Sequence, residues 1–213
     1  MKTDELINVL STNVEPIDRR QLSREIVAAV ILGTVVAIGT ALALPGMRMD
    51  LSAPNALTYF CAKIIFATVI VIAGTAYLLR LARPGVVSPT RSAPVPWPPV
   101  AVAALSTVSL VSAPLWHWHN MAMGDGWLEC LVSIPIIAVV PFAAVVWAVR
   151  RMAPTDLART GALAGFVAGG ISAAGYALHC TDDSWPFIAL WYGGAILMCT
   201  LAGALLGPRL LRW

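Results

Sequence analysis

The chain is poor in charged residues, which make up only 12% of its 213 positions, whereas 59% of the positions are hydrophobic. This balance excludes an ordinary soluble domain and is typical of an integral membrane protein. The first 24 residues contain four acids and lack the apolar core of a cleavable signal peptide, so we expect none. The net charge of +3 does not indicate direct nucleic-acid binding, because the basic residues flank hydrophobic segments instead of forming a soluble patch.

Two further absences restrict the chemistry. The four cysteines form no Cys-x-x-Cys pair, so the chain carries neither a zinc ribbon nor a thioredoxin-type motif. The long apolar segments contain almost no ionisable side chains, whereas a carrier or ion transporter needs polar ligands along its spans. We therefore expect a protein that is not an enzyme. A membrane thiol oxidoreductase or a metal carrier is kept as the alternative interpretation.

What the chain does contain is a set of six segments that are long and apolar enough to cross a bilayer. They predict an all-α integral membrane protein with six transmembrane helices. The third segment follows a proline-rich stretch, residues 84–96, which is typical of an extended linker. The expected spans are Ile26–Leu44, Tyr59–Leu79, Pro98–Leu115, Leu131–Val149, Gly161–Leu178 and Pro186–Leu206.

The lysine and arginine residues predict the orientation of these spans. When alternate connections are grouped, twelve basic residues fall on one side, and two, Arg48 and Lys63, fall on the other. Because loops rich in lysine and arginine stay in the cytoplasm, both termini should be cytoplasmic. Residues 1–24 then form a cytoplasmic tail, and residues 25–213 form a transmembrane domain. Lys63 lies just inside the second span, and we expect its amine to reach the outer headgroups.

The tail has the pattern of a short amphipathic helix. Leu6, Ile7, Leu10 and Val14 form one apolar stripe, and Pro16 should end the helix. An isolated helix of about twelve residues is marginal in water, so this one needs a surface to lie on. That surface is either a soluble partner protein or the membrane lipid headgroups.

Two loops on the side opposite the tail collect the side chains that bind metals or react. One loop, 116–130, contains His117 and His119 together with two methionines, and the other begins with His179 and Cys180. Imidazole combined with thiolate or thioether suits a soft metal ion, so the three histidines are candidate ligands of a transiently bound ion. The spacing matches no standard metal site, and plain polar residues at the level of the headgroups are an equal alternative.

Cys130 and Cys180 each lie at an outer helix end, and three interpretations of them stay open. They form a structural disulfide, if the outer compartment is oxidising. Alternatively, they are a redox-responsive or metal-responsive pair whose state moves two spans against each other. The third interpretation is that they are inert small hydrophobic residues.

Glycines recur every four residues in the fifth span, at Gly161, Gly165 and Gly169, and again in the sixth span, at Gly203 and Gly207. Such spacing lets helix backbones approach closely. We expect it to serve packing within the bundle, with a homodimer face as the alternative.

Three segments carry a family resemblance when they are taken in order. They are Met1–Ile7 with Pro16 and Arg20, then Trp127–Leu131 with Ser133–Pro135, and then His179–Cys180 with Phe187, Trp191 and Tyr192. Together they resemble the NrsF-type membrane anti-sigma factors over nearly the whole chain. The resemblance implies a negative regulator that holds an extracytoplasmic-function sigma factor at a bacterial inner membrane.

The resemblance also implies that the sigma factor is released when the outer cysteines, Cys130 and Cys180, meet a metal or oxidative stress. In the tail, the apolar stripe from Leu6 to Val14 is then expected to bind an apolar groove on the sigma factor. No family motif covers the loop His117–Met123, so its role stays open.

Overall fold

The computed structural model is all-helical, with no strand in the residues that it describes, which are Thr3, 19–43, Arg48, 55–81, 97–152 and 154–212. The predicted partner-binding residues Leu6, Ile7, Leu10 and Val14 lie outside the described residues. The proline-rich stretch before the third span also lies outside them.

Each of the six apolar segments is mostly helical where it is described. The first five are α2 (Arg19–Ala43), α3 (Ala56–Leu81), α4 (Trp97–Val111), α6 (Trp127–Arg150) and α7 (Leu157–Ala177). The last is a continuous stretch of α8 (Trp185–Phe187), the π-helical η2 (Ile188–Tyr192) and α9 (Gly193–Leu210). Two short helices, η1 (Leu115–His117) and α5 (Trp118–Met123), lie between α4 and α6.

Five helical stretches in the described part of the chain are long and apolar enough to cross a membrane, as in a helical membrane protein. They comprise all the expected spans except the third. α4 has 15 residues, which is about 22 Å of helix, whereas a hydrocarbon core is about 30 Å thick. Six complete spans therefore stay a prediction.

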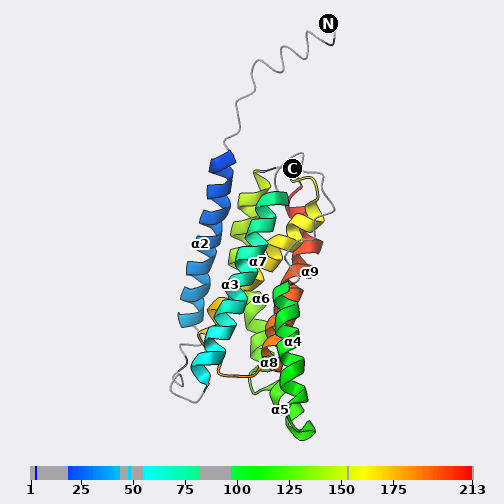
Figure 1. Cartoon of the computed structure of the whole chain (residues 1–213). Helices are drawn as coiled ribbons and strands as arrows, with labels where there is room; N and C mark the ends of the chain where they lie inside the picture. Colours follow the sequence, from blue (N-terminus) through cyan, green and yellow to red (C-terminus); the bar gives the residue numbers. More distant parts are fainter. Residues whose placement is uncertain are drawn as a thin grey trace.

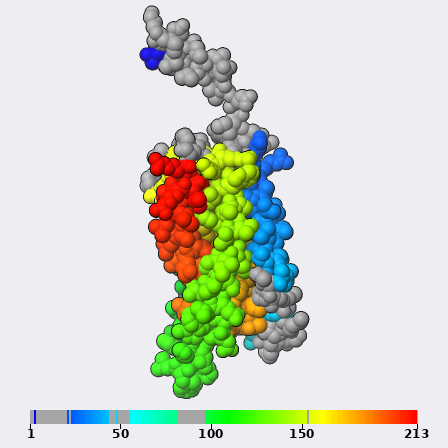
Figure 2. All heavy atoms as spheres, turned by 180° about the vertical axis from the view of Figure 1, so that it is seen from behind, coloured from blue at the N-terminus to red at the C-terminus, as the bar shows by residue number. Residues whose placement is uncertain are grey.

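The chain runs back and forth along one bundle. The start of α2 and the end of α9 lie at the same end of the bundle (Figure 1 and Figure 2). α3 also ends there, whereas α6 begins at the opposite end, beside α5 (Figure 1). The chain must therefore return between Leu81 and Trp127, and α4 forms part of that return. Placing the two termini in the cytoplasm stays a prediction.

α7 is the central helix, because 72% of its most apolar stretch is buried, against 28–33% for the other spans. Its glycines explain this burial. A Cβ atom on Gly161 would lie 2.6 Å from the Cα atom of Gly207, and one on Gly165 would collide with the carbonyl of Cys199. At Gly161 and Gly165 the backbones of α7 and α9 thus leave no room for a Cβ atom. Packing within the bundle is confirmed as the use of this spacing, and the same face has no room for a second copy.

The two ends of the bundle differ in their charged groups. At the end where α2 starts, Glu25 pairs with Arg151 at 3.3 Å, and Arg159 pairs with Asp156 at 3.1 Å. We call this the basic end. The opposite end carries Cys130 and Cys180, and we call it the thiol end.

Candidate functional site

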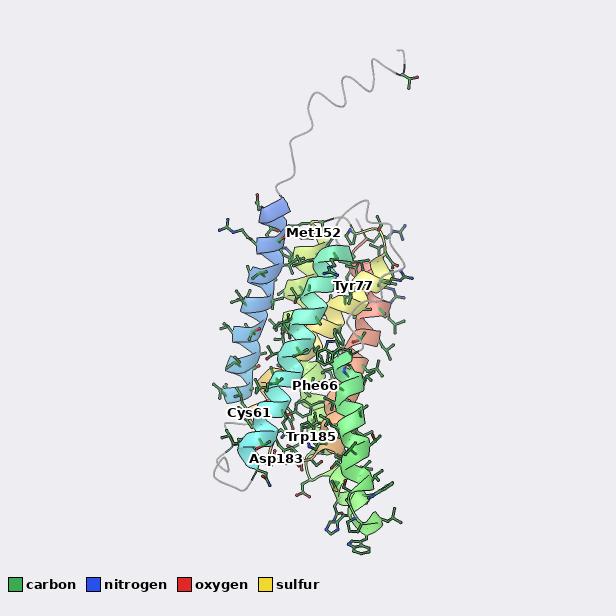
Figure 3. The ribbon with its side chains drawn as sticks, in the orientation of Figure 1. Cys61, Phe66, Tyr77, Met152, Asp183 and Trp185 are labelled. Carbon is green, nitrogen blue, oxygen red and sulfur yellow. The ribbon has the colours of Figure 1, made fainter. Side chains whose placement is uncertain are left out.

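Two buried cations meet one carboxylate at the thiol end. Arg48 Nη2 lies 2.7 Å from Asp183 Oδ2, and Lys63 Nζ lies 3.1 Å from Asp183 Oδ1. Arg48 Nη1 donates a further hydrogen bond of 3.1 Å to Oδ1, so the guanidinium binds the carboxylate with two parallel bonds. Both cationic side chains are fully buried. Figure 3 shows Asp183 and Trp185 beside the part of α3 that carries Cys61.

The expectation that Lys63 reaches the outer headgroups is wrong. Its side chain is completely buried and turns inward to Asp183 and to the backbone of Cys180. Burying an amine without partners is costly, but a carboxylate and a carbonyl inside the fold satisfy this one. The Lys63 amine therefore pairs inside the bundle instead of reaching the lipid headgroups.

The same two cations hold the backbone of Cys180. Its carbonyl oxygen accepts hydrogen bonds from Arg48 Nη1 at 3.0 Å and from Lys63 Nζ at 3.1 Å. The backbone N–H of Arg48 also donates to Leu178 O at 3.0 Å. α7 ends at Ala177, and carbonyls beyond a helix end lack helical donors and favour nearby positive charge. Arg48 and Lys63 supply both the donors and the charge.

Cys130 and Cys180 are brought together in one buried cluster. Both belong to the apolar core that also includes Tyr176, Phe187 and Tyr192. Cys130 is completely buried and Cys180 is 4% exposed. Both thiols are free, and both side chains belong to this one cluster. The role of Cys130 and Cys180 as sensors stays a prediction.

Tyr192 approaches the thiols from the π-helical turn η2. Such turns insert an extra residue into a helix and are frequent at functional sites. The Tyr192 ring is fully buried in the same apolar core as Cys130 and Cys180. Its hydroxyl is buried and has no hydrogen-bond partner among the described residues.

The connection between α5 and α6 is fastened to the loop after Cys180. Asp182 accepts hydrogen bonds from the backbone N–H groups of Asp125 at 3.0 Å and Gly126 at 2.9 Å. Ser184 Oγ donates to Met121 O at 2.6 Å, and it also caps α8 by accepting from the Phe187 N–H. Side chains of the loop 181–184 thus position both the thiol end of α6 and the start of the last span.

Gly124 is required at the turn between α5 and α6. Its φ angle is +56°, a left-handed value that residues with a Cβ atom rarely adopt. A Cβ atom there would also lie 2.6 Å from Asp182 Oδ1 and 2.8 Å from the Phe187 ring. The turn therefore brings the backbone directly against the Asp182 carboxylate.

A polar pocket of about 230 Å³ opens beside Cys180. Its lining combines three carboxylate residues with aromatic, histidine and thiol side chains, whereas Cys130 is not among them. The lining residues are Asp125, Gly126, Glu129, Tyr176, His179, Cys180, Thr181 and Asp182.

The three histidines do not converge. His117 lies in η1 and His119 in α5, and both are exposed. His179 lies at the end of α7, in edge-to-face contact with the Tyr176 ring at 5.9 Å. In the described part of the chain, no three histidine, cysteine, aspartate or glutamate residues are grouped so that they could hold a metal ion. A metal role for these histidines stays a prediction.

The sequence did not predict that Arg48, Lys63 and Asp183 form a buried cluster of ion pairs. A usable signal existed, because Arg48 and Lys63 are the two basic residues predicted on the side opposite the tail. A cation within an apolar span usually needs an acidic partner, and Asp182 and Asp183 lie on that same side. The pattern did not indicate which acid would be reached.

The fold and the site together define a helical membrane protein with a buried cluster of charges and thiols at one end. Comparisons with known proteins extend this. The family described as "NrsF: Negative regulator of sigma F" matches residues 10–213. The chain is 32% identical over 213 residues to the "Probable anti-sigma-F factor NrsF" of Azospira oryzae, covering all of both chains. It is 32% identical over 220 residues to the "Anti-sigma-F factor NrsF" of Caulobacter vibrioides, again covering all of both. No solved structure matches.

The chain therefore belongs to the NrsF family of anti-sigma factors, the negative regulators of sigma F. The resemblance found in the sequence is confirmed. Proteins of this family are regulatory and bind a sigma factor as their partner.

Proposed function

We propose that this protein is an inner-membrane anti-sigma factor that sequesters an extracytoplasmic-function sigma factor through its cytoplasmic tail. It releases that factor when an oxidative or metal signal reaches Cys130 and Cys180. The observation that carries the proposal is the family match over residues 10–213, together with two full-length relatives that are named as anti-sigma-F factors.

In the tail, the apolar stripe of Leu6, Ile7, Leu10 and Val14 enters an apolar groove on the sigma factor. This is the common helix-in-groove mode of recognition, in which residues spaced by three or four positions anchor the helix. The proposal is supported by the spacing of the stripe and by the polar residues on the opposite face.

The thiol end provides the input, and α2 connects it to the tail. α2 spans 25 residues, or about 37 Å of helix, and it packs mainly against α6 and α7. Arg48 follows α2 in the chain and binds both the Cys180 carbonyl and Asp183. A change at Cys180 therefore acts on the segment that follows α2, and through α2 on the tail.

The free energy available from disulfide formation is comparable with the free energy that release of the sigma factor requires. Changing a partner from mostly bound to mostly free requires differential stabilisation of about 5 kcal/mol. Forming one disulfide changes stability by roughly 2–4 kcal/mol, and rearrangement of the buried ion pairs adds to it. One chemical event at the thiols thus accounts for most of the required change.

The tail part of the proposal is tested by replacing Leu6 and Leu10 with Asp in the full-length protein. Co-purification of the sigma factor from membranes should be lost, because two charges would enter the apolar groove. The matched control is Asn8→Asp with Ser11→Asp, which adds the same charge to the polar face. If the leucine variant retains its partner as well as the control does, the groove model is wrong.

The input part is tested by Cys130→Ser and Cys180→Ser, with Cys199→Ser as the matched control. Treatment with hydrogen peroxide or copper ions should release the sigma factor from the wild type and from the control. The two test variants should retain it. Equal release from all four proteins would contradict sensing by Cys130 and Cys180.

A further inference from the structure

Resting on the proposed function, we infer that Cys180 is the thiol that reacts first, with a small uncharged oxidant of the peroxide class. Lys63 is the positioning residue that stabilises the negative sulfur during this reaction. Cys130 then completes a disulfide with Cys180.

The first argument is the position of Lys63. Its Nζ atom lies 3.5 Å from Cys180 Sγ while it also donates to the Cys180 carbonyl and to Asp183. A thiolate, and not a thiol, is the nucleophile, and a neighbouring cation favours it. Asp183 is shared between Arg48 and Lys63, and of these two cations it is Lys63 whose charged atom reaches Cys180 Sγ.

The second argument is access. Cys180 lines the polar pocket, whereas Cys130 is fully buried and does not. The pocket, with a volume of about 230 Å³, has ample room for a peroxide. Its three carboxylate residues, Asp125, Glu129 and Asp182, repel anions. A small uncharged oxidant is therefore the reagent class that the entrance admits.

The chemistry balances without any other reactant. The Cys180 thiolate forms an S–O bond with one peroxide oxygen as the O–O bond breaks, and the leaving hydroxide takes up a proton to become water. The positive charge of Lys63 stabilises the negative charge on both sulfur and leaving oxygen. Cys130 then attacks the resulting sulfenic acid, an S–S bond forms, and the hydroxyl group leaves as a second water. Two thiols are oxidised and one peroxide is reduced.

The order of reaction is tested in the full-length protein in membrane vesicles. Cys130→Ser and Cys180→Ser are exposed to hydrogen peroxide with dimedone, and the trapped sulfenic acid is located by mass spectrometry. The adduct should form on Cys180 in the first variant at least about tenfold faster than on Cys130 in the second. Equal rates, or faster reaction at Cys130, would overturn the inference.

The role of Lys63 is tested by Lys63→Met in the Cys130→Ser background. Trapping at Cys180 should slow by about tenfold, and Lys63→Arg should restore most of the rate because it retains the charge. A merely structural role would not show this rescue. Unchanged trapping in Lys63→Met would overturn the positioning role.

A further measurement tests the entrance and requires no change at Lys63. In the Cys130→Ser protein, alkylation of Cys180 by uncharged iodoacetamide is compared with alkylation by anionic iodoacetate, using a free cysteine peptide as reference. Cys180 should favour the uncharged reagent by at least about fivefold more than the peptide does, because three carboxylates line the entrance. A ratio equal to that of the peptide would contradict the proposed entrance.

These outcomes are separable from failure of the proposed function. If Cys130 reacts first while both serine variants still retain the sigma factor under oxidant, the inference fails and the proposed function stands. If the serine variants release the sigma factor as the wild type does, the sensing function fails whatever the order of reaction.

Discussion

The two ends of the bundle handle charge in opposite ways. At the basic end, the ion pairs are open to water, with the side chains of Arg151 and Arg159 exposed by 52% and 72%. At the thiol end, Arg48 and Lys63 are fully buried around Asp183. The basic residues of the first end are the ones that predict which side faces the cytoplasm. Those of the second end hold the loop that carries Cys180.

The difference shows that the number of charged residues at one end does not indicate how much each contributes to stability. Exposed pairs are screened by water and contribute about 0–1 kcal/mol each. Removing one partner of a buried pair leaves the other charge uncompensated and costs far more. The end with fewer basic residues is therefore the more sensitive one.

The largest effect is expected from Asp183→Asn. It removes the carboxylate that both buried cations bind, so we expect a loss of about 3–5 kcal/mol in the free energy of unfolding. Reversible unfolding of the full-length protein in detergent measures this loss. Glu25→Gln at the basic end is the matched control, with an expected loss of less than about 1 kcal/mol. Equal losses at the two ends would contradict the comparison.

An intermediate effect is expected from Gly165→Ala, which probes the contact between α7 and α9 that joins the two ends. The added Cβ atom would collide with the Cys199 carbonyl, and separating the helices should cost about 1–3 kcal/mol. Gly194→Ala is the control, because nothing lies within 4 Å of its added Cβ atom. Similar thermal unfolding of the two variants would show that close packing of α7 on α9 does not stabilise the bundle.

A smaller effect is expected from Trp191→Phe at the thiol end. It removes the hydrogen bond of 2.7 Å from the indole N–H to Ala122 O and should cost about 0.5–1.5 kcal/mol. Hydrogen exchange in α5 should also become faster, because this bond fastens α5 to η2. Trp116→Phe is the control, since Trp116 is 78% exposed. No difference between the two variants would mean that α5 is held by other contacts.

The smallest effect is expected from Arg151→Gln at the basic end. The Arg151 side chain is 52% exposed, so the loss should stay below about 1 kcal/mol and should vanish at high salt. The measurement is unfolding at low and at high ionic strength. A loss that is large and independent of salt would show that the basic end is as specifically built as the thiol end.

The helices and much of the candidate site follow from the sequence. Apolar runs of about twenty residues predict spans because backbone groups in lipid must be satisfied within a helix. The five long helices agree with that rule, and α4 is helical but shorter than expected. The glycine spacing correctly indicated close packing within the bundle, and Cys130 and Cys180 were correctly expected at the same end.

What the sequence by itself determined is therefore the helical membrane class, the family, and the pair of thiols at one end of the bundle. Only the tertiary structure decided the surroundings of those thiols. The ion pairs to Asp183 join residues 135 and 120 positions apart, and no local pattern encodes such a meeting. Judged only by its position in the sequence, Lys63 satisfies the rule for a lysine that reaches the headgroups. It turns inward because folding places a carboxylate and a carbonyl within hydrogen-bonding distance of its amine, inside a bundle where an unpaired charge would be costly.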